Sequence, residues 1–575
     1  MRFTIRSLLV LFAFGATFAY AQTNNIPQIQ HVIVVIQENR TPTNLFHEDI
    51  NLRNHGAHVV PPNNQGRCHY THPAVTLTGA PLALGADPHH DHRDSWTAMY
   101  DGGLMDGACD IKVSYTGCDT SNCPYGLGQY CQYTYVSNTD GTLNPYFQIA
   151  DQYGFANWMF QTNQGPSQEA HQFLFSGTSA PDFYGDQQQN CGSYPCWQWF
   201  AAENDGNGGG CLAPSGAQIW EIAPDGTYSN HGYQPPGETP GYPCFYHSSL
   251  PTLLKDAGIS WRHYTNSGWG IWNAPKSIGP ICGPDSQHQD CQGSEYTNNV
   301  YVGNPAQLLT DLGANPNDHE CNLQRVSWVI PDGNWSDHPG QGSIDAGPSW
   351  VAAIVNGVGG FDNAGHPVTP KCYDTVGEKQ IPYWQDTAIL ITWDDWGGFF
   401  DDILPPDCRP GPSGSCSGYA NGGGNGKQYV YGFRVPLLVV SAYTPPGYIS
   451  GPCNAQTGDC TGARTSLTTH DFGSILNFVE YVFGQNGQYL DHGAYPTGIG
   501  DYRFPYADYF APDAYPACLT CSYSLSDFFD FSTYGNLPRS FTPIIASYGT
   551  SCFFHPTVCF GTGYPADPDD DAIDP

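Results

Sequence analysis

Continuous apolar runs recur along this chain, and segments of helical periodicity lie between them. Four runs, at 31–36, 325–330, 387–393 and 434–440, are apolar without alternation. This pattern predicts strands that are covered on both faces. Helical spacing behind a Ser or Asp predicts helices over 167–175, 250–257 and 474–483. Strands that alternate with helices, without an internal repeat, indicate an α/β protein.

The first 21 residues have a different pattern. Arg2 and Arg6 precede an apolar run from residue 8 to about 18, and Ala19 and Ala21 flank Tyr20 as a small-x-small cleavage site. This arrangement predicts a secretory signal peptide over residues 1–21. The run is shorter than the roughly 20 apolar residues that cross a bilayer. We therefore expect a secreted or periplasmic protein without a transmembrane anchor.

Cysteine usage agrees with export, because the 21 cysteines call for an oxidising compartment. An odd number leaves at least one thiol unpaired or bonded to another chain. The CxxC of Cys518 and Cys521 is interpreted as a structural disulfide, because no second CxxC or nearby histidine accompanies it. Short spacing also predicts local disulfides for the pairs Cys191/Cys196, Cys282/Cys291, Cys408/Cys416, Cys453/Cys460 and Cys552/Cys559.

Composition divides the remainder of the chain. A Gly-, Asn- and Cys-rich region at about 181–300 is interpreted as a loop-rich insertion or lid within one large domain over 22–545. The glycine cluster that starts at Asn421 predicts a surface loop. Residues 546–575 are expected to form a disulfide-stapled segment and a disordered acidic tail.

Net charge limits the partners. Asp and Glu number 53 against 19 Lys and Arg, which gives a formal charge of −34. Nucleic-acid binding depends on cationic neutralisation of phosphates, so we expect no nucleic-acid partner. The same repulsion disfavours anionic lipid sheets. A zwitterionic lipid or a small phosphorylated molecule is compatible with this charge.

Polar side chains follow two of the predicted strands directly. Glu38 and Asn39 follow the first strand and offer oxygen ligands for a divalent cation, whereas Arg40 either anchors the loop or meets a phosphate. Asp394 and Asp395 follow the strand at 387–393, and adjacent carboxylates repel each other unless a cation lies between them. Each pair taken alone is also compatible with a solvated turn. Because ligands bind outside the carboxyl ends of strands in open α/β sheets, we expect a metal site here.

A hydroxyl and several histidines complete the candidate chemistry. Ser167 follows a Gly-Pro turn and opens a predicted helix, so it is either an N-cap or a nucleophile that faces the helix N-terminus. His90 stands in a histidine cluster with His89 and His92, and His338 follows another predicted strand. Histidine beside aspartate indicates metal ligation or proton transfer.

These motifs together resemble the bacterial phosphoesterases that include phospholipases C and acid phosphatases. The resemblance spans about residues 29–541. It rests on HVIVVIQENR, DPHHDHRDSW, QTNQGPSQEAHQFLFSGTS, VSWVIPDGNWSDHP, ITWDDWGGFFDD and YGFRVPLLVVSAY, which occur in the family's order. It implies an alkaline-phosphatase-like α/β/α sandwich with a central, mostly parallel sheet and long disulfide-stapled loops. The domain over 22–545 would then be the catalytic domain.

The resemblance also implies roles for individual residues. Glu38, Asn39, Asp394 and Asp395 would hold a divalent metal, and the metals considered are calcium, magnesium, manganese, zinc and iron. Ser167 would be the covalent nucleophile. His90 and His338 would line the phosphate pocket with Arg40, and one of the two would protonate the leaving group.

Three departures from the family pattern leave the substrate class open. Asp402 stands where many relatives carry His, Ala170 stands where phospholipases often carry Asn, and TPTNLF follows Arg40 in place of the usual segment. Asp337 also replaces a Glu. The expected activity is that of a phospholipase C acting on a phospholipid headgroup ester, with an acid phosphatase acting on small phosphomonoesters as the alternative. A secreted surface- or carbohydrate-binding protein that retains the fold is the alternative of another class.

Overall fold

The computed structural model describes residues 24–560 apart from several gaps. The residues outside the description are 1–23, 71, 85, 116–117, 120–129, 181–189, 192–193, 196–198, 205–208, 223–226, 231–233, 236, 248, 269, 316, 341–343, 377–378, 406–430, 452–468, 491–522 and 561–575. The predicted signal peptide, the glycine cluster from Asn421 and the acidic end of the tail lie outside the described residues. The Cys518/Cys521 pair lies outside them as well.

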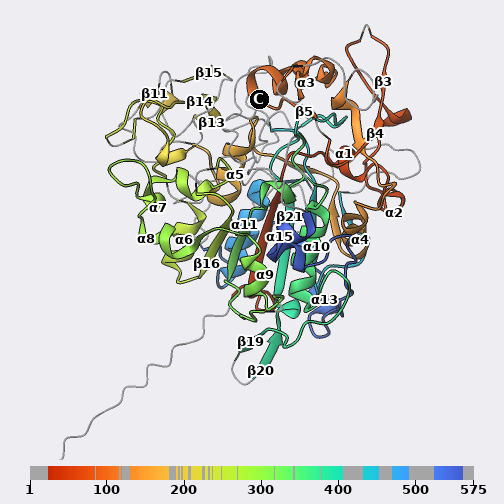
Figure 1. The fold of residues 1–575 in the computed structure, drawn as a ribbon, viewed down its shortest axis with the longest axis vertical. Helices are drawn as coiled ribbons and strands as arrows, with labels where there is room; N and C mark the ends of the chain where they lie inside the picture. The colour runs from red at the N-terminus through yellow and green to blue at the C-terminus, as the bar shows by residue number, and fades with distance from the viewer. Residues whose placement is uncertain are drawn as a thin grey trace, which may run out of the picture.

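An eight-stranded sheet forms the centre of the protein (Figure 1). Only β22 runs antiparallel to its neighbours in this sheet, which confirms the expected mostly parallel α/β fold. Every residue of β1 and β21 is buried, as their unbroken apolar sequences predict. In sheet order the strands are β17 (Val300–Val302), β16 (Trp261–Thr265), β18 (Val326–Val329), β1 (His31–Gln37), β21 (Thr387–Trp393), β22 (Leu437–Ser441), β9 (Gly154–Ala156) and β23 (Tyr448–Ser450).

The four predicted strands are therefore present. The last of them begins at Leu437 rather than at residue 434. Pro436 has no N–H to give to a neighbouring strand, so regular pairing starts after it. The Arg434 side chain is instead buried against Asp401. The chain before β22 is thus held by this side-chain contact and by isolated backbone hydrogen bonds, such as that from the Val435 N–H to the Met159 carbonyl over 3.1 Å.

Helices pack against the sheet in two groups. α5 (Ser167–Ser176) packs against α6 (Leu250–Asp256) and α11 (Phe472–Phe483), and these three confirm the predicted helices to within two residues. α10 (Gly347–Gly359) packs against α4 (Asn144–Gln152), α9 (Gln307–Asp311) and β21. All thirteen residues of α10 are buried, so its sequence lacks the polar face by which a surface helix is recognised.

The region expected to be an insertion also supplies part of the sheet. β16 lies between β17 and β18, and α6 leads into it, so residues from Leu250 onward belong to the central layers. A separate small sheet precedes them, and it is formed by β13 (Phe200–Asn204), β14 (Ile219–Ile222) and β15 (Tyr228–Ser229). This structure narrows the candidate insertion to the part of 181–300 that precedes α6.

Disulfides staple the loops. The bonds Cys282–Cys291 and Cys552–Cys559 confirm two predicted pairs. The other three predicted pairs include residues outside the description. Three further disulfides join cysteines that are far apart in the sequence, so short spacing could not predict them. They are Cys68–Cys109, Cys211–Cys244 and Cys321–Cys372. Within the described ranges, no helix combines the length and the apolar character that a membrane crossing needs.

Candidate active site

The site forms where β1 and β21 end side by side. The two strands are in parallel register from His31 with Thr387 to Gln37 with Trp393, so Glu38 and Asp394 leave the sheet at the same edge. Asn39 adopts a left-handed conformation with φ of 59°, and its backbone N–H donates to Asp394 Oδ1 over 2.9 Å. The two loops are thereby fixed to each other.

The Gly-Gly pair after the aspartates is required by this close approach. Gly397 has φ of 62°, and a Cβ on it would lie 2.3 Å from the backbone oxygen of Asn39. The Gly397 N–H donates to Asp395 Oδ1 over 2.6 Å, while the Asp395 N–H donates to Asp394 Oδ1 over 2.7 Å. The backbone thus orients both carboxylates, and no larger residue would fit at Gly397.

Ser167 reaches the same place from α5. Pro166 occupies the N-cap position, so Ser167 is the first residue of the helix rather than its cap. The Ser167 Oγ lies 3.4 Å from Asn39 Oδ1 and 3.3 Å from Asp395 Oδ2. The hydroxyl is buried between groups of the two strand ends.

His171 belongs to the cluster although the motif analysis did not select it. It lies one helical turn after Ser167, and its Nε2 is 3.0 Å from Glu38 Oε1 and 3.7 Å from Asp394 Oδ2. The only sequence signal was the spacing of four residues, which places both side chains on one face of a helix. The contact with Glu38 depends on how α5 packs, and no local pattern reveals that.

A divalent cation fits the donors gathered here. Glu38, His171 and Asp394 each offer a ligand atom within 4.8 Å of the others, and all three residues are buried. Asp394 Oδ2 accepts no hydrogen bond from any residue that the structure describes. A buried carboxylate oxygen of this kind favours a cation. Glu38, Asn39, Asp394 and Asp395, with His171, are the residues that would hold it.

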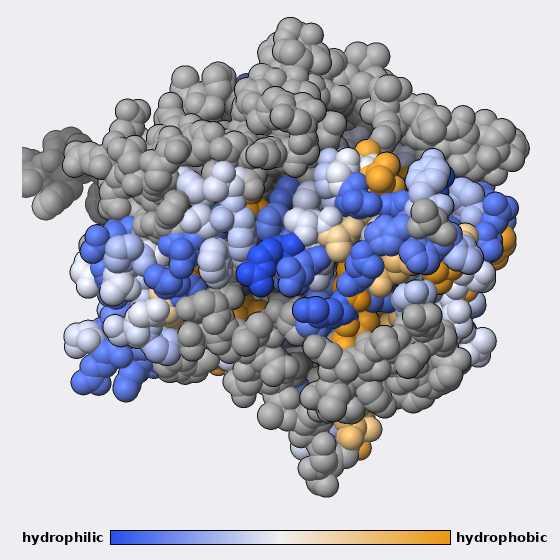
Figure 2. Space-filling model, turned by 90° about the horizontal axis from the view of Figure 1, so that it is seen from above, coloured by the Kyte–Doolittle hydropathy of each residue, from blue (hydrophilic) through white to orange (hydrophobic). Residues whose placement is uncertain are grey.

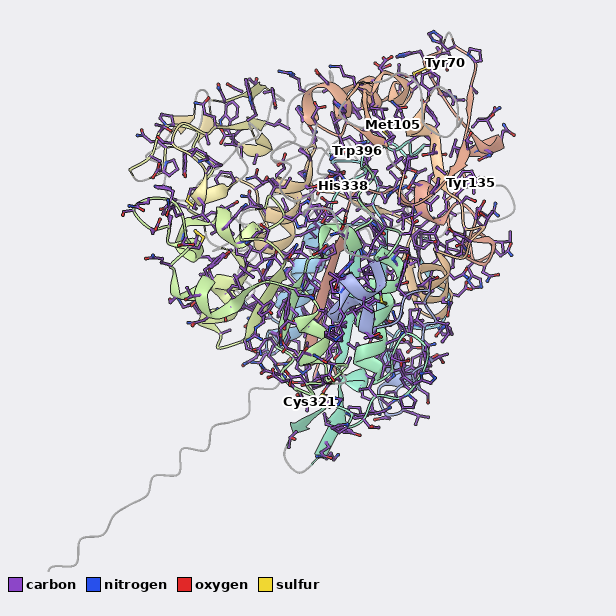
Figure 3. The ribbon with its side chains drawn as sticks, viewed as in Figure 1. Tyr70, Met105, Tyr135, Cys321, His338 and Trp396 are labelled. Carbon is purple, nitrogen blue, oxygen red and sulfur yellow. A yellow bond between two sulfur atoms is a disulfide. The ribbon has the colours of Figure 1, made fainter. Side chains whose placement is uncertain are left out.

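His90 and His338 lie at the rim of this cluster. His90 Nδ1 is 3.0 Å from the Pro88 carbonyl oxygen, which places the ring proton on Nδ1. His90 Nε2 then accepts from the Asn39 side-chain amide over 2.9 Å, and it lies 4.0 Å from Asp395 Oδ2. The His338 ring is centred 6.1 Å from that of His90. Figure 3 shows His338 and Trp396 close together at this end of the sheet.

His92, another member of the histidine cluster, has different surroundings. His92 packs against Trp96 and Tyr228, with ring centres 5.7 and 5.1 Å away, and burial lowers its pKa to about 4. A neutral, stacked imidazole of this kind serves packing. Within the motif, the structure therefore brings His90 to the strand ends.

Arg40 is buried, and its guanidinium contacts the protein on several sides. It donates to the backbone oxygens of Asp337 and Leu82 over 2.8 Å each, and to Asn44 Oδ1 over 3.1 Å. Burial lowers its pKa to about 10. The sequence left open whether Arg40 anchors the loop or meets a phosphate. These contacts favour the role of loop anchor.

The departures from the family pattern are integrated into the fold. Asp402 accepts from His58 Nε2 over 2.9 Å, so an imidazole is present there from another segment. Residues 42–46 form the short helix α1 (Pro42–Phe46), capped by the Thr41 hydroxyl. Ala170 is fully buried on α5. The end of the molecule seen in Figure 2, above the site, presents mainly polar described side chains with small apolar patches.

A buried hydroxyl lies beside carboxylates and histidines that could hold a metal ion, at the carboxyl edge of a mostly parallel sheet. This arrangement is compatible with hydrolysis of phosphoric esters. Residues 29–485 match the Phosphoesterase family, and the chain belongs to that family.

Named relatives are similar at low identity. Phospholipase C B of Mycobacterium tuberculosis is 24% identical, over 73% of this chain and 70% of its own length. Non-hemolytic phospholipase C of Burkholderia pseudomallei is 22% identical, over 81% of this chain and 56% of its own length. Phospholipase C A of M. tuberculosis is 28% identical, but the match spans only about a third of either protein (34% of each).

Proposed function

We propose that this protein is an exported, metal-dependent phosphoesterase that acts as a phospholipase C on a phospholipid headgroup ester. One observation carries the proposal: the Ser167 hydroxyl lies 3.4 Å from Asn39 Oδ1 and 3.3 Å from Asp395 Oδ2, beside a cluster that fits a cation. The similarity to two bacterial phospholipases C supports the choice of substrate. The disulfides fit the oxidising compartment of a secreted or periplasmic protein.

The proposed reaction has two steps. Ser167 Oγ attacks phosphorus, its proton passes to Asp395 Oδ2, a bond from serine oxygen to phosphorus forms and the bond to the leaving alcohol breaks. Water then attacks phosphorus, the bond from phosphorus to the serine oxygen breaks, and the phosphorylated headgroup leaves with the oxygen of water. The proton on Asp395 returns to the serine oxygen, and one proton of water passes to the histidine that protonated the leaving alcohol. A bound divalent cation would neutralise negative charge on the serine oxygen and on the phosphoryl oxygens.

The chain's own groups orient these steps. The Asn39 side chain is held between His90 and Ser167, because its amide donates to His90 and its oxygen faces the serine. A protonated His90 or His338 would protonate the leaving oxygen. For His90, Nε2 must then carry a proton in place of the hydrogen bond that it accepts from Asn39. Arg40 keeps the loop in place through its backbone contacts.

Acid phosphatase activity on small monoesters is the second candidate. Ala170, one turn of α5 away from the nucleophile candidate, stands where phospholipases often carry Asn, and this difference favours a changed substrate preference. Turnover of phosphatidylcholine and of p-nitrophenyl phosphate by the mature protein, each with and without chelator, separates the two activities.

Replacement of Ser167 tests the nucleophile. Ser167→Ala should abolish turnover and phosphoserine formation after acid quench, because it removes the attacking oxygen. Ser176→Ala is the matched control, since Ser176 ends the same buried helix and its hydroxyl bonds to the Gln172 and Thr178 carbonyls. The control should lose about 1 kcal/mol of stability and keep its turnover. Near-wild-type turnover by Ser167→Ala would refute the proposal.

A further inference from the structure

A second cluster of metal-ligating side chains lies at the opposite ends of the same two strands. His31 is the first residue of β1, and Asp386 directly precedes β21. Asp374 comes from β19 (Tyr373–Val376), which forms a hairpin with β20 (Lys379–Pro382). His31, Asp374 and Asp386 each offer one ligand atom, and these three atoms lie within 4.8 Å of one another.

The two clusters are well separated. Figure 1 shows the β19–β20 hairpin at the lower end of the molecule, and in Figure 3 Cys321 lies at that end, far from His338 and Trp396. The strands between the clusters span seven residues, which at about 3.3 Å per residue gives roughly 20 Å. Binding at one end can therefore be measured independently of binding at the other.

His31 is oriented as metal-binding histidines are. Its Nδ1 lies 2.9 Å from the Gln324 carbonyl oxygen, which can only accept, so the ring proton is on Nδ1. Its Nε2 faces Asp374 Oδ2 over 3.0 Å. When the imidazole is neutral, His31 Nε2 and Asp374 Oδ2 both carry lone pairs and repel each other. A proton or a metal ion must therefore lie between them. The ring packs edge-on against Tyr383, which fixes its direction.

Asp386 supplies the second, independent observation. Its side chain is only 2% exposed, and neither carboxylate oxygen accepts a hydrogen bond from the described residues. Arg325 Nη1 lies 3.8 Å from Asp374 Oδ2 and balances one of the two carboxylates. A bound cation would balance the other carboxylate, whose oxygens have no hydrogen-bond partner among the described residues.

We propose that His31 Nε2, Asp374 and Asp386 bind a divalent cation of the zinc class. One imidazole nitrogen with two carboxylate oxygens suits zinc, whereas calcium and magnesium prefer oxygen ligands alone. The ion enters from solvent past Asp374, whose side chain is 25% exposed. It links the β19–β20 hairpin to the sheet, next to the Cys321–Cys372 disulfide.

Zinc titration of the chelator-treated, full mature chain tests this site. Asp374→Asn should bind one zinc ion fewer than wild type by calorimetry, and zinc should raise its melting temperature less. Asparagine keeps the shape of a partly exposed side chain, so the variant is expected to fold. Calcium is the second probe, and it should shift the melting temperatures of wild type and Asp374→Asn equally.

Asp394→Ala separates this site from the one at the other strand ends. That variant should retain the zinc ion that Asp374→Asn loses. Equal zinc stoichiometry and affinity for wild type and Asp374→Asn would show that the cluster holds a proton, which overturns the proposal. Anomalous scattering from wild-type crystals grown with zinc gives a readout that needs no variant. A peak beside His31 Nε2 and Asp386 supports the site, and its absence refutes it.

Discussion

Asp394 and Asp401 are both completely buried on the segment that leaves β21, yet their surroundings differ. Asp401 receives two hydrogen bonds of 2.6 Å from the Arg434 guanidinium, one on each oxygen, and a third from Thr43. Asp394 receives backbone N–H groups on Oδ1, while Oδ2 has His171 at 3.7 Å and no hydrogen bond among the described residues.

The difference separates a structural carboxylate from a candidate metal ligand. A buried carboxylate is stable when a cation of the protein neutralises it, and Arg434 fills that role for Asp401. Arg434 also donates to the carbonyls of His58 and Asn157 over 3.0 Å each, so the pair joins several segments below the site. Asp394 instead has an oxygen that suits an external cation.

The largest expected effect is on activity, from Asp394→Ala. Turnover should fall by several orders of magnitude, on the order of the contribution of a catalytic metal, while the protein stays folded. The melting temperature should fall, because the N–H groups of Asn39 and Asp395 lose their acceptor. The measurement is turnover with metal in excess, alongside thermal melting. Asp256→Ala, at an exposed position at the end of α6, is the control for loss of one negative charge. Undiminished turnover by metal-free wild type would contradict this account.

Arg434→Met tests the other side of the comparison through stability. It leaves the Asp401 carboxylate buried without its cation, so the free energy of unfolding should drop by about 3–5 kcal/mol. Denaturant unfolding measures the loss. The double variant Arg434→Met/Asp401→Leu removes both charges and should recover a large part of that loss. If it recovers nothing, the effect of Arg434 comes from its contacts with the backbone carbonyls.

Asp337→Asn examines an intermediate case and should have the smallest effect. Asp337 accepts from the Tyr146 hydroxyl over 2.7 Å and from Trp393 Nε1 over 2.9 Å, and burial raises its pKa from 3.8 to about 6. A raised carboxyl pKa means that ionisation costs stability. The cost is absent below pH 3.8, grows between 3.8 and 6, and is complete above 6.

The asparagine variant cannot ionise, so its stability relative to wild type should rise across that pH range by about 3 kcal/mol. Unfolding curves recorded at pH values from about 4 to 7 measure the difference. A difference that stays constant with pH would show that the native Asp337 carboxyl titrates at its ordinary pKa.

Sequence patterns predicted the parts of the fold that depend on local signals. Long apolar runs revealed β1 and β21, but β9 has only three residues, and β16 contains Arg262 and His263 among its apolar positions. Short or polar strands of this kind are recognised only from their neighbours in the sheet. The sequence pattern did not predict α10 for a related reason: the helix is fully buried, so it has no polar face to reveal helical periodicity.

In the candidate site, too, some residues were predictable from local sequence and others only from the packing of distant segments. Glu38, Asn39, Asp394 and Asp395 follow strand ends, and that position is visible in the sequence. His171 meets Glu38 only through the packing of α5, and Arg40 turns to the Asp337 and Leu82 carbonyls rather than outward. Contacts between distant segments decide both cases, so the sequence alone left them open.

Complete burial of α5 has a consequence for how the site moves. All ten residues of the helix are buried, including Ser167 and His171. Such a helix has no exposed side from which to fray, so its amide protons exchange with solvent only when much of the domain opens. We therefore expect α5, with the Ser167 hydroxyl, to keep its place while substrate enters and product leaves.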